Sequence, residues 1–181
     1  MKGTSTKERK IEGGEEQQIF KNRRIEATYS NGSYTVGWVL ALPKEQTAAV
    51  AMLDGKQPAI PTPAGDPNAY TLGSIGGHNI AIACLPKKRI GIVSAATVAA
   101  NMVNTFPSIK FGLMVGIGGG VPRKGSDVQL GDVVVSSPSG QFGGVVQWDM
   151  GKAKEGGKFE RTGSLNSPPA SLLSALSRIE T

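Results

Sequence analysis

Two short, continuous apolar runs constrain the fold of this chain more than any other feature. They occupy residues 35–42 (TVGWVLAL) and 110–116 (KFGLMVG). Neither run alternates apolar with polar residues, as a strand with one solvated face would. Such runs are typical of strands that are covered on both faces, as in the parallel sheets of α/β proteins. The sequence therefore predicts a buried sheet with helices packed against it.

The segments between these runs fit the same architecture. Pro43 suits the first turn of a helix, which we predict over residues 43–53. A second helix is predicted over residues 91–106 and ends before Pro107. Between the helices, β-rich runs flank Gly-Gly-His-Asn at residues 76–79 and predict a hairpin. The order strand, helix, hairpin, helix, strand predicts an α/β fold with a central mixed sheet.

Further elements are expected after residue 120. β-Prone runs predict strands at residues 131–138, 145–149 and 158–162. Ser167 is a suitable N-cap for a final helix whose leucines fall at helical spacing. Residues 1–33 are polar and charged, and we expect a disordered leader there. Residues 34–181 would then form the folded domain.

Composition excludes several classes of protein. No apolar run reaches the roughly 18 residues that cross a membrane, so we expect no membrane association. The net charge of +6 is spread along the chain without a basic stripe interleaved with aromatic residues, which argues against nucleic acid as a partner. The lone Cys84 excludes an internal disulfide, and it fits a cytoplasmic protein.

A glycine-rich run follows the second apolar strand directly, and it is the candidate substrate-binding element. Its residues are Gly116, Ile117, Gly118, Gly119 and Gly120. Ligands of α/β sheets bind beyond the carboxyl ends of strands. Glycines there allow backbone N–H groups to approach an anion or a sugar. The alternative is a sharp turn that needs glycine only for positive φ.

Two common nucleotide motifs do not fit this run. The third glycine of a G-x-G-x-x-G motif would fall on Val121, and Pro122 follows where that motif begins a helix. Without a helix N-terminus, a pyrophosphate would lack its dipole partner. No Gly-Lys-Ser/Thr follows the glycines, so a P-loop is excluded as well.

The ordered set of motifs resembles the nucleoside phosphorylase superfamily. The matching segments are TVGWVLALPKE, YTLGSIGGHNIAIACL, SAATVAANM, GLMVGIGGGVP and LGDVVVS, within residues 34–179. The superfamily includes purine and uridine phosphorylases and the methylthioadenosine/S-adenosylhomocysteine nucleosidases. The likeness is closer to a fungal branch in which such a domain stands at the N-terminus of NLR-type proteins. The segment KFERTGSLNSPP also matches that branch.

The resemblance implies a fold, a reaction and a partner. The fold would be a three-layer α/β/α sandwich with a central mixed sheet, incomplete at its C-terminal side. The reaction would be cleavage of the N-glycosidic bond of purine nucleosides, with the nucleoside as the small-molecule partner and no cofactor. Water attacks the sugar in the nucleosidases, whereas phosphate is the co-substrate in the phosphorylases. A homo-oligomer would also agree with the resemblance, since members of this superfamily often complete their active sites across subunits.

Glu45 is the candidate catalytic residue. It stands where the similar nucleosidases carry the glutamate that activates water, so it would act as a general base or bind a ribose hydroxyl. The alternative is that Glu45 only favours the first turn of a helix through the helix dipole.

The glycine run departs from the phosphorylase pattern at two positions. Similar phosphorylases carry R-x-G-S/T, in which the arginine and the hydroxyl grip phosphate. Met114 and Ile117 occupy those positions here, and neither side chain donates a hydrogen bond. This argues against phosphorolysis. Arg123, Lys124 or the basic group at residues 87–89 would have to replace the arginine, unless they are solvated surface charges.

Catalysis also requires residues that have no counterpart here. In the family, an aspartate that protonates the base and a Met-Glu element that binds ribose lie in the second half of the domain. Glu45 alone cannot serve both faces of the sugar. We therefore expect this chain to be catalytically incompetent and its complete parent to cleave nucleosides. The alternative is a non-catalytic nucleoside-sensing or interaction module of an NLR-type protein.

Four other residues have simpler interpretations. His78 is expected in a hairpin turn, and Cys84 is expected to be a small side chain of the core. Trp148 and Asp149 follow a pair of glycines and would either line a pocket or end a strand.

Overall fold

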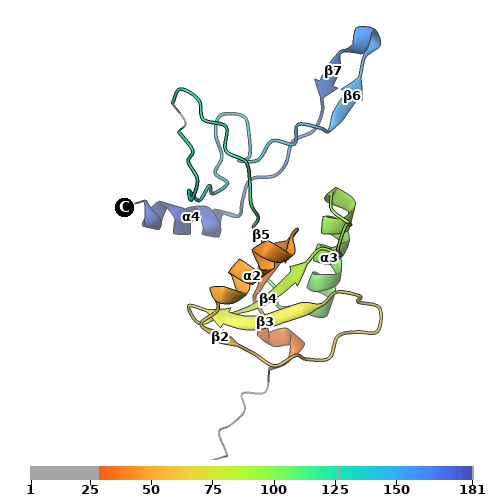
Figure 1. Cartoon of the computed structure of the whole chain (residues 1–181), viewed down its shortest axis with the longest axis vertical. Coiled ribbons are helices and arrows are strands. Elements are labelled where there is room, and N and C mark those ends of the chain that lie inside the picture. Colours follow the sequence, from red (N-terminus) through yellow and green to blue (C-terminus); the bar gives the residue numbers. More distant parts are fainter. Residues whose placement is uncertain (1–28, 126, 181) are drawn as a thin grey trace, which may run out of the picture. The chain divides into compact units, whose positions relative to one another are not determined.

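The computed structural model describes residues 29–125 and 127–180 (Figure 1). They group into two compact units, residues 29–118 and residues 119–125 with 127–180. Most of the predicted leader lies outside the described residues. Its last residues, Asn31–Ser33, form the short 3-10 helix η1. None of the helices in the described part of the chain is long and apolar enough to cross a membrane.

A five-stranded mixed sheet forms the centre of the first unit. Its strands lie in the order β2 (Gly55–Lys56), β3 (Tyr70–Ile75), β4 (His78–Cys84), β1 (Val36–Leu40) and β5 (Phe111–Met114). Strand β1 runs parallel to both β4 and β5, whereas β3 runs antiparallel to β4 and β2. The predicted α/β class and the mixed sheet are confirmed.

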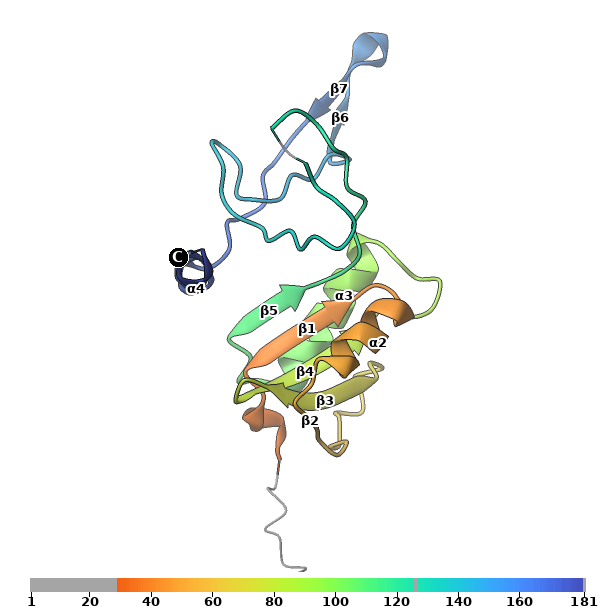
Figure 2. The same ribbon diagram turned by 60° about the vertical axis from the view of Figure 1, so that its left-hand side comes forward.

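Strand β1 is apolar throughout because both of its faces are covered (Figure 2). Alternate side chains enter two separate cores, as the period of a strand requires. On one face Trp38 and Leu40 pack in a cluster with Ala49 of helix α2 (Pro43–Ala51). On the other face Val39 packs in a cluster with Val98 of helix α3 (Ile92–Thr105) and its neighbours. Burial on both sides explains the unbroken apolar run that the sequence shows.

The β3–β4 hairpin turns through two glycines. Gly76 and Gly77 have φ values of 55° and 83°, and Ile75 pairs with His78 on either side of them. Positive φ at both central residues defines a type I′ turn, which matches the twist of the strands and favours glycine. His78 is the exposed first residue of β4. The predicted hairpin is therefore confirmed.

A buried hydrogen-bond network ties the connection between β2 and β3 to helix α3. Oδ2 of Asp66 accepts bonds from the hydroxyls of Tyr70 at 2.6 Å and Thr105 at 2.5 Å. The side-chain amide of Asn68 donates to the carbonyl of Val98 at 3.0 Å. Burial and the bond to Asp66 raise the pKa of Tyr70 to about 12. The network pairs the polar side chains of Asp66, Asn68 and Tyr70 where this proline-rich segment meets helix α3.

The second unit contains a small hairpin and one helix. Strands β6 (Gly151–Ala153) and β7 (Phe159–Arg161) pair antiparallel, with the 3-10 helix η2 (Glu155–Gly157) between them. Lys154 and Glu160 form a salt bridge across this hairpin. Helix α4 spans Ala170–Ile179.

Expectations for the second unit were correct only in part. Strand β7 and helix α4 confirm the predicted elements, although α4 begins after Pro169 and not directly after Ser167. The predicted strands at residues 131–138 and 145–149 are wrong, because the structure has no strand at either place. A β-prone run becomes a strand only where a neighbouring strand satisfies its backbone groups. These two runs form no ladder with another strand.

Gly73 offers a test of packing in the first sheet. A Cβ at this position would lie 2.7 Å from the carbonyl oxygen of Gly55 and from a methyl group of Leu53. We expect Gly73→Ala to lower the free energy of unfolding by about 1–3 kcal/mol through overpacking. Gly65→Ala is the matched control, since nothing lies within 4 Å of its Cβ position. Urea denaturation measures both variants, and equal stabilities would contradict the packing described for β2 and β3.

Candidate functional site

The carboxyl ends of three parallel strands meet at one edge of the first sheet. Strand β1 leads into helix α2, β5 leads into the glycine-rich run, and β4 leads into the basic residues 87–89. Ligands of α/β sheets bind beyond this kind of edge. The topology therefore brings the predicted catalytic carboxylate and the start of the predicted binding run to the same place.

Glu45 connects the two elements directly. Its side chain, only 7% exposed, turns back from the first turn of α2. The backbone N–H groups of Ala41 and Leu42 each donate to Oε2 of Glu45 at 2.8 Å. The N–H of Ile117 donates to Oε1, also at 2.8 Å. One carboxylate thus joins the turn between β1 and α2 to the chain that leaves β5.

Gly116 is required by this contact and not by its backbone angle. A Cβ at Gly116 would lie 2.8 Å from Oε1 of Glu45, whereas the Cβ position of Gly118 has open space around it. None of the glycines in the run adopts positive φ. The alternative interpretation, a sharp turn that needs glycine for positive φ, is therefore wrong. At Gly116 the missing side chain allows the carboxylate to reach the backbone.

The surroundings of Glu45 favour its ionised form. Burial by itself would raise its pKa, but the N–H groups of Ile117, Leu42 and Ala41 together hold the pKa below its ordinary value. Each carboxylate oxygen can accept two hydrogen bonds. Oε2 already accepts two and Oε1 accepts one, so a single acceptor position remains on Oε1. The arrangement suits a fixed hydrogen-bond acceptor better than a base that must take up a proton near neutral pH.

The side chains beside the run are apolar and exposed. Met114 at the end of β5 is 71% exposed, and Ile117 is 73% exposed although its N–H is bonded to Glu45. Cys84 at the end of β4 packs against the core cluster of Trp38 and Ile82, as expected for a small core residue. The edge thus combines exposed apolar surface with a buried carboxylate.

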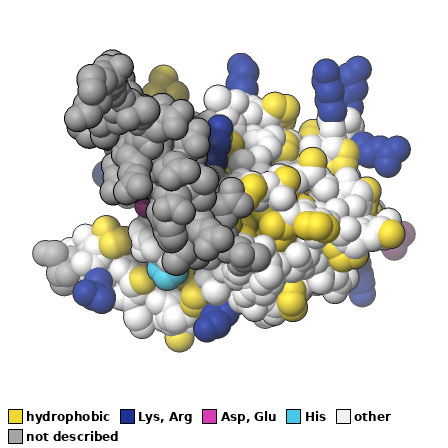
Figure 3. Space-filling model, turned by 90° about the horizontal axis from the view of Figure 1, so that it is seen from below, with side chains coloured by type: hydrophobic (Ala, Val, Ile, Leu, Met, Phe, Trp, Pro, Cys, Tyr) yellow, Lys and Arg dark blue, Asp and Glu magenta, His cyan; other side chains and the backbone are white. Residues whose placement is uncertain are grey.

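The remaining predicted residues divide between the two units. Lys87, Lys88 and Arg89 are exposed after β4, and Lys88 adopts a φ of 66°. In the face shown in Figure 3, Lys and Arg side chains stand singly or in small groups around apolar surface.

Four further predicted residues, namely Gly119, Gly120, Arg123 and Lys124, belong to the second unit. The site geometry therefore consists of Glu45, Gly116, Ile117 and Gly118. In residues 29–125 and 127–180, no group of three or more His, Cys, Asp or Glu side chains could hold a metal ion.

Sequence reasoning missed the backbone partners of Glu45. The N–H of Ile117 lies 72 positions along the chain from Glu45, so no local pattern relates the two. The only sequence signal was a glycine at the end of a buried strand. Such a glycine indicates a close approach of another group but does not identify the group.

Neutralising Glu45 should weaken the fold in a pH-dependent way. Because the folded-state pKa lies below its ordinary value, ionised Glu45 stabilises the fold above the unfolded-state pKa of about 4.3. That contribution is lost as the pH falls through the lower, folded-state pKa. Glu45→Gln places an amide among backbone donors, and we expect it to cost about 1–3 kcal/mol at pH 7.

Urea denaturation between pH 3 and pH 7 measures this difference. The two stabilities should converge at the acidic end of the range. Glu155→Gln, an exposed residue of η2, is the control and should leave the stability unchanged. A Glu45→Gln protein as stable as the wild type at pH 7 would contradict the assigned hydrogen bonds.

The contact between Gly116 and Glu45 can be isolated by a double-mutant cycle. We expect Gly116→Ala to cost about 1–3 kcal/mol of stability, because the new methyl group displaces a carboxylate held by three bonds. Gly118→Ala, with open space around it, should change the stability by no more than about 0.5 kcal/mol. In a Glu45→Ala background the cost of Gly116→Ala should largely disappear. Additive effects would show that the two residues do not touch.

Comparisons with known proteins give one related protein. No family model matches the chain, and no solved structure matches it. A nucleotide-binding leucine-rich repeat (NLR)-like protein of Hyaloscypha variabilis is 55% identical over 147 residues. The match covers 81% of this chain but only 14% of that protein. The chain is therefore related to one segment of a much longer fungal NLR-like protein.

Proposed function

We propose that this chain is a nucleoside-binding part of an NLR-type protein and has a nucleoside phosphorylase-like fold. The observation that carries the proposal is the bond from the N–H of Ile117 to Glu45, which joins a buried carboxylate to a glycine-rich backbone at the carboxyl edge of the sheet. In a longer NLR-type parent protein that contains this segment we expect a three-layer α/β/α sandwich. The similarity to a segment of an NLR-like protein supports the proposal that this chain is part of such a protein.

The chemistry of the edge suits a ribose that carries a flat aromatic base. The remaining acceptor position on Oε1 of Glu45 can receive a bond from a sugar hydroxyl. Beside it, Gly118 leaves backbone accessible to the sugar. The exposed side chains of Met114 and Ile117 offer apolar surface for a planar base. A neutral nucleoside needs no cationic group in these contacts.

The surroundings of Glu45 favour nucleoside binding without cleavage as the function of this chain. A general base should have a pKa near the working pH, so that it can take up the proton of the attacking water. Glu45 has a lowered pKa and three backbone donors. It would therefore orient a hydroxyl or a water molecule more readily than it would deprotonate one.

Cleavage of the N-glycosidic bond by a longer NLR-type parent protein is the second candidate. The free acceptor position on Glu45 supports it, because it can hold a water molecule beside the sugar. The oxygen of this water would bond to the anomeric carbon as the C–N bond breaks, while another group protonates the departing base. The proton lost by the water would pass through Glu45 to solvent. Hydrolysis is favoured over phosphorolysis in this proposal. Met114 and Ile117 cannot grip phosphate, since neither side chain has a donor.

Calorimetry and product analysis with adenosine, inosine and methylthioadenosine test both candidates. We expect saturable binding of at least one nucleoside to this chain, and about tenfold weaker binding to Glu45→Gln, a loss of about 1.4 kcal/mol. Glu155→Gln is the control and should bind as the wild type does. Chromatography of the same mixtures detects free base, which we expect only from the full-length parent protein. If no nucleoside binds saturably to this chain or to the full-length parent protein, the proposal is overturned.

A further inference from the structure

A cavity of about 460 Å³ lies within the second unit. Neither the proposed nucleoside binding nor the proposed nucleoside cleavage involves it. Its walls come from two segments, residues 141–150 and residues 161–165. The cavity is open to solvent: its apolar lining includes Phe142, Val146, Met150 and Leu165, which are 38–55% exposed, and its polar lining includes Gln147 and Arg161. Small-molecule sites in proteins occupy about 300–1,000 Å³ and combine apolar walls with a few polar groups. The size and lining of this cavity fit that description.

Close backbone packing frames the cavity. A Cβ at Gly143 would lie 2.7 Å from the carbonyl oxygen of Leu165, so the two lining segments touch through their main chains. Gly144, with a φ of 116°, packs against Ser136. Phe142 is held by two hydrogen bonds of 3.0 Å between its backbone and that of Ser139. The glycine pair that the sequence shows at residues 143–144 therefore serves to bring these segments together.

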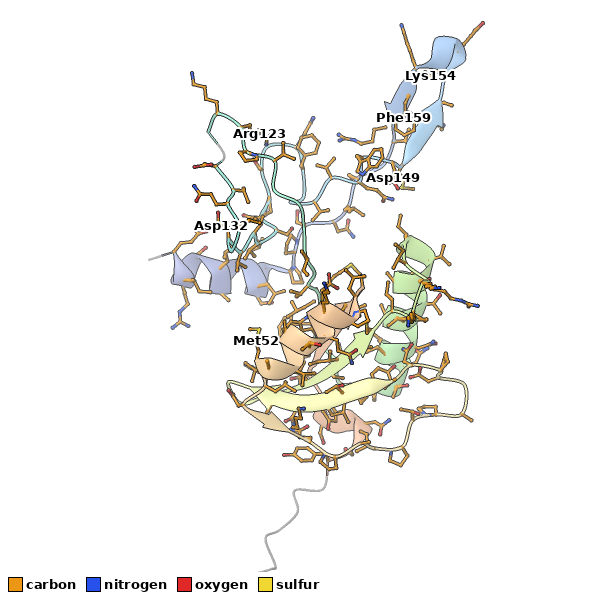
Figure 4. The ribbon with its side chains drawn as sticks, viewed as in Figure 1. Met52, Arg123, Asp132, Asp149, Lys154 and Phe159 are labelled. Atoms are coloured by element: carbon orange, nitrogen blue, oxygen red, sulfur yellow. The ribbon has the colours of Figure 1, made fainter. Side chains whose placement is uncertain are left out.

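Arg161 is the charged residue of the lining, and its exposed side chain lies against an aromatic ring. Its guanidinium carbon lies 5.1 Å from the centre of the Phe142 ring, within the range of a cation–π contact. Residue 161 ends β7, and the next N–H, of Thr162, donates to the carbonyl of Met150 at 3.1 Å. Glu160 on the same strand forms its salt bridge with Lys154, farther along the hairpin (Figure 4). Trp148, 81% exposed, and Asp149 are not part of the lining.

From these features we infer that the cavity binds a small monocarboxylate with an aromatic body. A guanidinium presents a planar fork of donors that matches a carboxylate. One positive charge balances the single charge of a carboxylate, whereas a phosphate monoester carries about two negative charges. The Phe142 ring and the aliphatic side chains around it would cover the apolar body of the ligand. This site is distinct from the proposed nucleoside site at Glu45. A neutral nucleoside would also be a poor ligand for the cavity, because it carries no negative charge to pair with Arg161.

Calorimetry and NMR titration of the full chain with benzoate and benzamide test the inference. The two probes have the same size and ring, but only benzoate carries a charge. We expect saturable binding of benzoate, with cross-peak shifts confined to residues that line the cavity. Benzamide should bind at least about tenfold more weakly, since it cannot pair with the guanidinium.

Two substitutions of Arg161 separate charge from geometry. Arg161→Gln should abolish the preference for benzoate, and Arg161→Lys should retain only part of it, because an ammonium lacks the planar fork. Lys152→Gln removes one positive charge from the neighbouring strand β6 without touching the lining, and it should bind as the wild type does. Unchanged circular dichroism and amide spectra establish that each variant is folded. Equal binding of the two probes to the wild type, or wild-type affinity in folded Arg161→Gln, would overturn the proposal.

Discussion

The first unit depends on three backbone N–H groups that converge on one carboxylate. Glu45 accepts bonds from Ala41 and Leu42 at the start of helix α2 and from Ile117 beyond strand β5. The bond from Leu42, the N-cap of α2, satisfies a donor at the start of the helix that has no partner within the helix. The three bonds also fix where the chain goes after the edge strand of the sheet. Removing the charge would therefore release two connections at once, and the glycine-rich run would lose its anchor.

Local sequence patterns correctly predicted two kinds of element: those that pair with a neighbour close in the sequence, and those that are buried on both faces. The hairpin at Gly76 and Gly77, strand β1 and helix α3 all followed from turn preferences and apolar periodicity. Residues 131–138 failed because their valines favour a strand only when another strand pairs with them. The bond from Ile117 to Glu45 and the bond from Thr105 to Asp66 could not be predicted, since each joins groups far apart in the sequence. Residue type suggested Glu45, but only tertiary structure shows what its oxygens bind.

The same bonds that position Glu45 also limit its chemistry. A carboxylate that several N–H groups stabilise holds its negative charge firmly and accepts a proton poorly. Glu45, which its place in the sequence suggested as a catalytic residue, thus joins two parts of the fold. One acceptor position on its carboxylate remains free. Beside it, the apolar side chains of Met114 and Ile117 are exposed.

The anchoring of the glycine-rich run by Glu45 can be measured most directly by amide hydrogen exchange. The backbone N–H of Ile117 belongs to an exposed residue, so burial of its side chain would not protect it. If the carboxylate accepts this N–H, its exchange should be about 10²-fold or more slower than that of an unstructured peptide, as for an opening free energy of about 2.7 kcal/mol. The protection should vanish selectively when the carboxylate is replaced by alanine. Exchange of Ile117 at the unstructured rate in the wild-type protein would contradict the account.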